Sequence, residues 1–169
     1  MIKVIVVEDQ ALVRGAISAL LSLNANIDVI AEAENGVQAL TLIKQNISEL
    51  DIVLTDIEMP EMSGIELIEQ LAVTQPQIKT MIMTTFARAG YIKRAISAGA
   101  KAFILKESPS EYLISAINKV QQGGKVITPE LALCALDDKD PLSSKERKAL
   151  KLAGNGLKTA DIAKQLFLS

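Results

Sequence analysis

Five residues with reactive or charged side chains follow short apolar runs in the first two thirds of the chain. Glu8 and Asp9 come directly after IKVIVV, and Asp56 follows DIVLT. Thr84 follows TMIM, and Lys106 follows AFIL. If these runs are parallel strands, the five side chains share the sheet edge at which open α/β sheets bind ligands. The spacing therefore predicts one polar site assembled from distant positions.

The carboxylates of this set indicate a metal site. Carboxylates gathered in one place repel each other unless a hard cation lies between them. Mg²⁺ suits such a site, because it binds one or two carboxylates and keeps several waters. We expect Asp9, Asp56 and the backbone carbonyl of Glu58 to bind Mg²⁺, with Glu8 reaching it through water.

Asp56 is the residue that we expect to react. A carboxylate at the end of a buried strand can attack a phosphoryl group and form an acyl phosphate. The transferred group carries negative charge that must be neutralised. The Lys106 ammonium would pair with one phosphate oxygen, and the Thr84 hydroxyl would donate to another. Any one of these acidic residues, taken alone, is better interpreted as a solvated charge in a loop. Their positions at successive strand ends, taken together, favour a site.

The composition excludes several other chemistries. The chain has no histidine, so histidine triads, histidine zinc sites and an internal phosphohistidine donor are excluded. Its single cysteine cannot form an internal disulfide. No apolar run approaches the roughly 18 residues of a membrane span, and the N-terminus lacks a signal-peptide pattern. We therefore expect a cytoplasmic protein without a membrane partner.

Strand-like and helix-like patterns alternate along the first 122 residues. We expect strands at 3–7, 29–31, 51–55, 80–83 and 102–105, and helices at 11–23, 37–45, 63–72, 91–98 and 109–122. Strict alternation of this kind predicts an α/β fold with a five-stranded, parallel, doubly wound sheet.

Local signals place several helix ends. Ser63 to Glu66 and Ser108 to Glu111 both fit a capping box. In the second box, Pro109 would occupy the first helical position, where its missing N–H costs nothing. Glycines at 99 and at 123–124 would end the fourth and fifth helices.

The chain changes character after residue 123. Residues 125–136 could form a short strand and turn, or a short helix after Pro129, and 137–140 form a charged stretch, so we interpret 124–140 as a linker. Residues 141–169 contain a third capping box, Ser143 to Glu146, and two short helical patterns. This segment has six basic and two acidic residues, which indicates either nucleic-acid binding or a solvated lysine-rich helix.

The stretches VIVVEDQALVR, DIVLTDIEMPEMSGIEL, MIMTTFARAG and AFILKESPSEYL resemble the receiver domain of bacterial two-component response regulators, over about residues 1–123. The resemblance implies a CheY/flavodoxin-like fold and phosphorylation of Asp56 by a sensor histidine kinase. It implies that Glu8 and Asp9 hold Mg²⁺ and that Lys106 contacts the phosphate. It also implies a protein that is no enzyme beyond assisting its own phosphorylation and dephosphorylation.

The same resemblance implies that Thr84 and Phe103 form a switch pair. In that family the threonine moves toward the phosphate and the aromatic side chain swings inward. The aromatic position is often tyrosine, and Phe103 lacks the hydroxyl. A plain core aromatic is the alternative interpretation of Phe103.

The tail PLSSKERKALKLAGNGLKTADIAKQLFLS resembles the first half of a LuxR-type helix-turn-helix domain, which indicates the NarL/FixJ group and its DesR-like members. Lys145 stands where arginine is usual, and Lys148 where glutamate is common. The resemblance implies a homodimer on phosphorylation, through the first and fifth helices. Because the recognition helix would begin beyond Ser169, we expect specific promoter binding of a longer form and not of these 169 residues.

Two other classes stay open. A phosphatase of the haloacid-dehalogenase type would also use an aspartyl phosphate, but it usually shows D-x-D-x-T, whereas this chain reads DIEMP at 56–60. A flavodoxin-like binding module needs a phosphate loop rich in glycine and hydroxyl groups after the first strand. The sequence Glu8-Asp9-Gln10 would repel a phosphate there.

Overall fold

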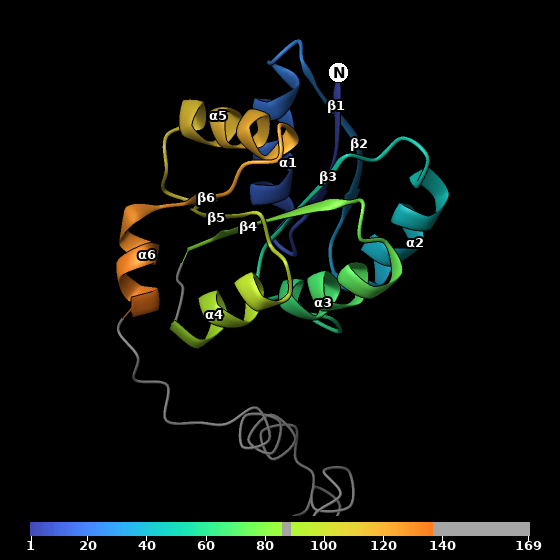
Figure 1. Cartoon of the computed structure of the whole chain (residues 1–169). Helices are drawn as coiled ribbons and strands as arrows, with labels where there is room; N and C mark the ends of the chain where they lie inside the picture. The colour runs from blue at the N-terminus through green and yellow to red at the C-terminus, as the bar shows by residue number, and fades with distance from the viewer. Residues whose placement is uncertain (86–88, 137–169) are drawn as a thin grey trace, which may run out of the picture. The chain divides into compact units, whose positions relative to one another are not determined.

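The computed structural model describes residues 1–85 and 89–136. Strands and helices alternate along this part of the chain (Figure 1). The chain divides into two units, Met1–Asp137 and Asp138–Ser169, and the second lies outside the described residues. The expected capping box at Ser143 and the two helices after it therefore stay predictions.

One sheet carries the described fold. Its strands are β1 (Ile2–Val7), β2 (Ile27–Ala33), β3 (Ile52–Thr55), β4 (Lys79–Thr84), β5 (Ala102–Leu105) and β6 (Val126–Ile127). The helices are α1 (Ala11–Ser22), α2 (Gly36–Asn46), α3 (Gly64–Thr74), α4 (Ala89–Ser97), α5 (Ser110–Gln121) and α6 (Pro129–Leu136). The strand order is β2-β1-β3-β4-β5-β6 and every pair is parallel, which confirms the predicted α/β class.

The sheet has one strand more than the five predicted. β6 lies in the segment interpreted as a linker, and α6 follows it, so both local alternatives for 125–136 occur in succession. Val126 N donates to Lys101 O, and the Thr128 amide and hydroxyl both donate to Phe103 O. These bonds pair the side of β5 that β4 leaves open. A strand of two residues is too short to show the alternation of apolar and polar residues by which a strand is predicted.

Helices cover both faces of the sheet. α1 and α5 lie on one face, and α2, α3 and α4 lie on the other (Figure 1). The central strand β3 is buried throughout, as its unbroken apolar run predicted. β2 is longer than the predicted range 29–31. It is an edge strand, and its exposed Glu32 and half-buried Asp28 interrupt the apolar pattern on which the prediction relied.

Of the two capping boxes predicted in the described residues, one is confirmed and one is wrong. Ser63 Oγ accepts from Glu66 N, and the Glu66 carboxylate accepts from Ser63 N at 2.9 Å, so this capping box is present. The box at Ser108 is wrong: α5 begins at Ser110, and its N-cap Pro109 makes no side-chain bond. Ser108 N instead donates to Leu105 O, because Ser108 completes the turn that leaves β5.

Gly99 ends α4 as predicted. Its φ of 99° lies in the left-handed region, and Gly99 N donates to Ile96 O while Ala100 N donates to Ala95 O. This pair of bonds is a Schellman motif, in which glycine avoids the steric cost of positive φ. Over residues 1–85 and 89–136, no helix combines the length and apolar character that a membrane crossing requires.

Candidate functional site

The predicted site residues come from the C-terminal ends of four adjacent strands. Glu8 and Asp9 follow β1, Asp56 follows β3, Thr84 is the last residue of β4 and Lys106 follows β5. Because β1, β3, β4 and β5 are neighbours in that order, these residues lie along one edge of the sheet, which we call the carboxyl edge. The structure thus brings all five residues to one edge, as predicted.

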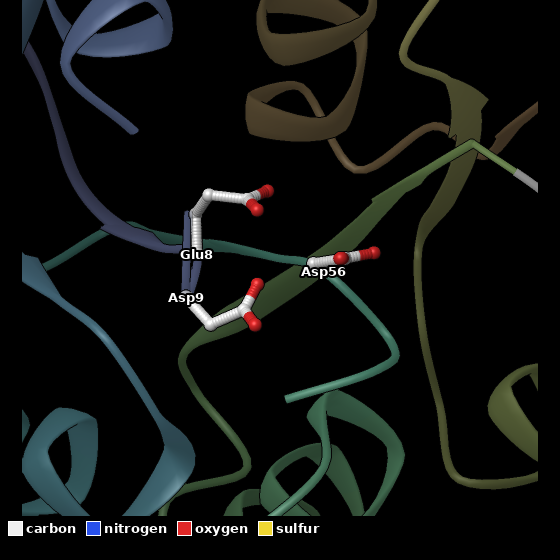
Figure 2. A group of neighbouring side chains, drawn as sticks. All are labelled: Glu8, Asp9 and Asp56. Carbon is white, nitrogen blue, oxygen red and sulfur yellow. The ribbon is translucent and has the colours of Figure 1, made fainter. Parts of the chain in front are cut away.

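Three carboxylates converge at this edge. Glu8, Asp9 and Asp56 each offer an oxygen within 4.8 Å of the other two. Figure 2 shows the three side chains projecting into one space from the ends of β1 and β3. Glu8 is 1% and Asp56 8% exposed, whereas Asp9 is open to solvent. Oxygen ligands in a half-open site of this kind fit a hard divalent cation that keeps part of its water shell.

Lys106 links two of these carboxylates. Its Nζ lies 2.6 Å from Glu8 Oε2 and 2.9 Å from Asp56 Oδ2. Burial raises the pKa of Glu8, and the bonds from Lys106 only partly oppose that effect. Burial lowers the pKa of Lys106, but the hydrogen bonds to Glu8 and Asp56 outweigh it, so the net pKa is raised and the ammonium stays charged. Among the described residues, Lys106 therefore contacts two of the three converging carboxylates.

Backbone contacts hold Asp56 firmly in place. Asp56 N donates to Val7 O at 2.9 Å, which extends the ladder between β1 and β3. Ile57 N donates to Asp56 Oδ1 at 2.7 Å, so each carboxylate oxygen has one donor, the second being Lys106. The remaining lone pairs of both oxygens are available to a ligand.

Gly64 lets helix α3 begin directly against Asp56. A Cβ atom on Gly64 would lie 1.8 Å from the Asp56 carbonyl oxygen. Gly64 N donates to Ile57 O at 3.0 Å, which closes the loop between β3 and α3. No side chain larger than hydrogen fits at this position without moving the backbone of Asp56.

The two residues of the expected switch pair are both buried. Thr84 is 4% and Phe103 1% exposed. Phe103 lies opposite Ile82 in the β4–β5 pair and belongs to the apolar cluster that also contains Leu131 of α6. Burial fits a switch aromatic in its inward position and equally a plain core residue, so the role of Phe103 stays a prediction. Glu58 is exposed in the loop after β3, and the metal-binding role of its carbonyl also stays a prediction.

Sequence reasoning missed Arg14 of α1. Its Nη1 donates to the carbonyl oxygen of Glu8 at 2.6 Å, and its Nε lies 3.4 Å from Glu32 Oε2. The signal was present, because Arg14 is the only charged residue in the helix ALVRGAISALLS. A lone charge in an apolar helix indicates a specific partner, but the pattern does not say which one.

Comparison with known proteins identifies the class. Residues 4–118 match the family model of the response regulator receiver domain. The chain is 39% identical over 168 residues to the transcriptional regulatory protein DesR of Bacillus subtilis, covering 99% of this chain and 82% of DesR. It is 40% identical over 169 residues to the uncharacterized transcriptional regulatory protein YvfU of the same organism, covering 100% of this chain and 84% of YvfU.

Solved structures agree with this assignment. The response regulator ChrA of a heme-sensing two-component system superposes with a TM-score of 0.69 at 31% identity, covering 99% of this chain and 82% of ChrA. A DNA-binding response regulator of the LuxR family from Staphylococcus aureus gives a TM-score of 0.68 at 36% identity, covering 72% of this chain and 99% of that one.

The fold, the acidic edge and these matches define a receiver domain of a two-component response regulator. Within that class, the chain belongs to the LuxR-family regulators of the DesR and NarL type. These matches support the regulator and not the phosphatase or flavodoxin-like alternatives.

Proposed function

We propose that Asp56 of this response regulator accepts a phosphoryl group from a sensor histidine kinase with the help of Mg²⁺, and that the acyl phosphate switches dimerisation and transcription. The observation that supports this most is the convergence of Glu8, Asp9 and Asp56, with the Lys106 ammonium bonded to Glu8 and Asp56. A buried excess of negative charge is costly unless a cation joins it. The carboxyl edge is therefore built for a divalent cation.

The residues of the carboxyl edge have different proposed roles in phosphoryl transfer. A carboxylate oxygen of Asp56 forms the new bond to phosphorus while the bond from phosphorus to the donor histidine nitrogen breaks. Mg²⁺, bound by Asp9, Asp56 and the carbonyl of Glu58, would neutralise the phosphoryl oxygens. Lys106 would pass its hydrogen bond from Asp56 to a phosphoryl oxygen, and Thr84 would donate to another. The chain assists its own phosphorylation and dephosphorylation, and no other substrate is implied.

Helices α1 and α5 supply the proposed surface of a phosphorylation-dependent homodimer. A groove of about 410 Å³ lies between them, lined mainly by apolar side chains that include Leu12, Ala16 and Leu113. Leu12 is 87% exposed at its rim. Gly15 and Ala16 are exposed beside it, so a second helix can approach closely. A two-fold dimer would bury the same patch on both copies.

The proposed domain division follows the relatives. Residues 1–123 form the receiver, extended by β6 and α6 within the 124–140 segment. Residues 141–169 would belong to the LuxR-type DNA-binding domain, and the alignment with DesR over 99% of the chain supports this. Promoter DNA is accordingly the proposed partner of a form that contains the recognition helix.

Incubation with acetyl phosphate and Mg²⁺, followed by peptide mass spectrometry, tests the proposed chemistry. We expect one phosphorylated residue, Asp56, and no phosphorylation of Asp56→Asn. Omission of Mg²⁺ should abolish the reaction in the unaltered chain. Undiminished phosphorylation of Asp56→Asn would contradict the assignment of the phosphoacceptor.

A further inference from the structure

Arg14 holds the turn from which two of the three converging carboxylates project. Its guanidinium Nη1 donates to Glu8 O at 2.6 Å, and its backbone N donates to Gln10 O at 2.9 Å. Asp9 is the residue between these two carbonyls. The guanidinium therefore restrains the Glu8–Asp9 peptide, directly before Asp9, while the bond to Gln10 O is the ordinary first backbone hydrogen bond of α1.

The turn has few other restraints. α1 begins at Ala11 after Gln10, and Gln10 makes no side-chain capping bond. The ladder bond on the β2 side ends at Glu8 N, which donates to Ala33 O at 2.9 Å. The next carbonyl, that of Glu8, accepts from the Arg14 guanidinium and not from a backbone N–H of a neighbouring strand. The long bond from Gln10 N to Glu8 Oε1, 3.3 Å, is a weaker restraint.

Glu32 of β2 orients the guanidinium from the other side. Its Oε2 lies 3.4 Å from Arg14 Nε. The Arg14 side chain is 18% exposed, whereas that of Glu32 is 43% exposed. An arginine with its fork held at two points is preorganised, because less rotamer entropy is lost for each hydrogen bond it makes.

We propose that Arg14 is a positioning residue that sets the place of Asp9, and with it the affinity of the carboxyl edge for Mg²⁺. This inference rests on the proposed function, because it assumes that Asp9 binds the cation. Arg14 has no proposed contact with the cation or the phosphoryl group, and it acts through the bond from its guanidinium to the Glu8 carbonyl. Outer partners that orient metal ligands typically account for about 10- to 100-fold in metal affinity.

The test measures Mg²⁺ binding to the whole 169-residue chain by isothermal titration calorimetry. Arg14→Met keeps most of the apolar stem and removes the guanidinium. We expect its Mg²⁺ dissociation constant to rise about 10- to 100-fold. The rate of Asp56 phosphorylation by acetyl phosphate should need correspondingly more Mg²⁺, but its maximum at saturating Mg²⁺ should stay close to that of the unaltered chain.

Arg94→Met is the matched control. Arg94 of α4 pairs with Glu69 of α3 through two hydrogen bonds of 2.6 Å and is not part of the carboxyl edge. The same substitution there should leave Mg²⁺ affinity unchanged. If Arg14→Met does not fold, Arg14→Gln, whose shorter amide cannot reach both partners, carries the same expectations.

Two outcomes overturn the inference. One is an unchanged Mg²⁺ affinity in the Arg14 variants while Asp9→Asn loses binding. The other is a fall in thermal stability without Mg²⁺ that is not accompanied by weaker Mg²⁺ binding, because Arg14 would then only support the fold. If Asp9→Asn also keeps full affinity, the proposed metal site itself is wrong.

Discussion

The two edges of the sheet both carry acidic residues and lysines, yet they differ in how the carboxylates are arranged. At the opposite edge, formed by the N-terminal ends of the strands and here called the amino edge, Asp51 accepts from Lys3 N at 2.9 Å and from Gln121 Nε2 at 2.8 Å. Lys3 Nζ pairs with Glu49, and Lys79 Nζ donates to Gln121 Oε1 at 2.9 Å. Asp51 and Glu49 there each have donors of their own.

At the carboxyl edge Glu8 and Asp56 share one lysine, and Asp9 lies beside them. In the described part of the chain, Glu8, Asp9 and Asp56 are the acidic residues that converge to within 4.8 Å. Acidic residues alone therefore do not make the site. The site arises where carboxylates converge with too few cations beside them, because only an added positive charge then balances their negative charge.

Replacement of one aspartate at each edge should give the largest difference between the two edges. Asp56→Asn should abolish phosphorylation and change stability little, since the weaker attraction to Lys106 is offset by less repulsion from Glu8. Asp51→Asn should keep full phosphorylation but lower the free energy of unfolding by about 1 kcal/mol, because an amide replaces one of its two acceptor oxygens. Acetyl phosphate labelling and urea denaturation check both. Loss of phosphorylation in Asp51→Asn would show that the two edges are not independent.

A glycine near each edge allows a second comparison. In Gly64→Ala the new Cβ would meet the Asp56 backbone at 1.8 Å, so the free energy of unfolding should fall by about 3 kcal/mol and phosphorylation should slow. In Gly124→Ala, near the start of β6, the nearest atoms are Cγ of Lys119 at 2.8 Å, a side-chain atom that can move, and the Lys119 carbonyl oxygen at 3.0 Å. That variant should lose about 1 kcal/mol. Equal losses in urea denaturation would argue against the close approach of α3 to Asp56.

The lysines of the two edges should separate metal binding from phosphoryl binding. Lys106→Ala should bind Mg²⁺ nearly normally but should bind beryllofluoride, a phosphoryl mimic, more weakly by about 1.5–3 kcal/mol, the value of a charge-assisted hydrogen bond. Lys79→Ala should change neither affinity. Calorimetric titrations with Mg²⁺ alone and then with beryllofluoride make the test. A loss of Mg²⁺ affinity in Lys106→Ala as large as that of Asp9→Ala would mean that the roles are divided wrongly.

The smallest effect concerns the two exposed leucines at the ends of α1. Leu12, near the carboxyl edge, is 87% exposed, and Leu23, just after the helix, is 89% exposed. Leu12→Lys should weaken the beryllofluoride-induced dimer by about 1 kcal/mol, because it places a charge at the rim of the groove. Leu23→Lys should leave the dimer intact, since Leu23 does not line the groove. Sedimentation velocity over a range of concentrations distinguishes them, and a monomer at all concentrations in the unaltered chain would contradict the proposed dimer.

Local patterns in the sequence predict the class of fold and the residues that meet at the carboxyl edge. Alternating patterns predicted parallel strands, and the C-terminal ends of parallel strands must share an edge. Glu8, Asp9, Asp56, Thr84 and Lys106 could thus be brought together from their positions at strand ends alone. The Ser63 cap and the Gly99 helix end were also predictable, because both depend on residues a few positions apart.

Other features depend on contacts between elements and have no local pattern in the sequence. β6 exists because the open side of β5 offers bonds to Val126 and Thr128. Ser108 does not cap α5, because its backbone N donates to Leu105 O in the turn that follows β5. Arg14 reaches the Glu8 carbonyl and Glu32 of β2 because α1 packs against β1 and β2. Each of these contacts depends on how elements pack against one another, and packing is set by the whole core rather than by the neighbouring residues.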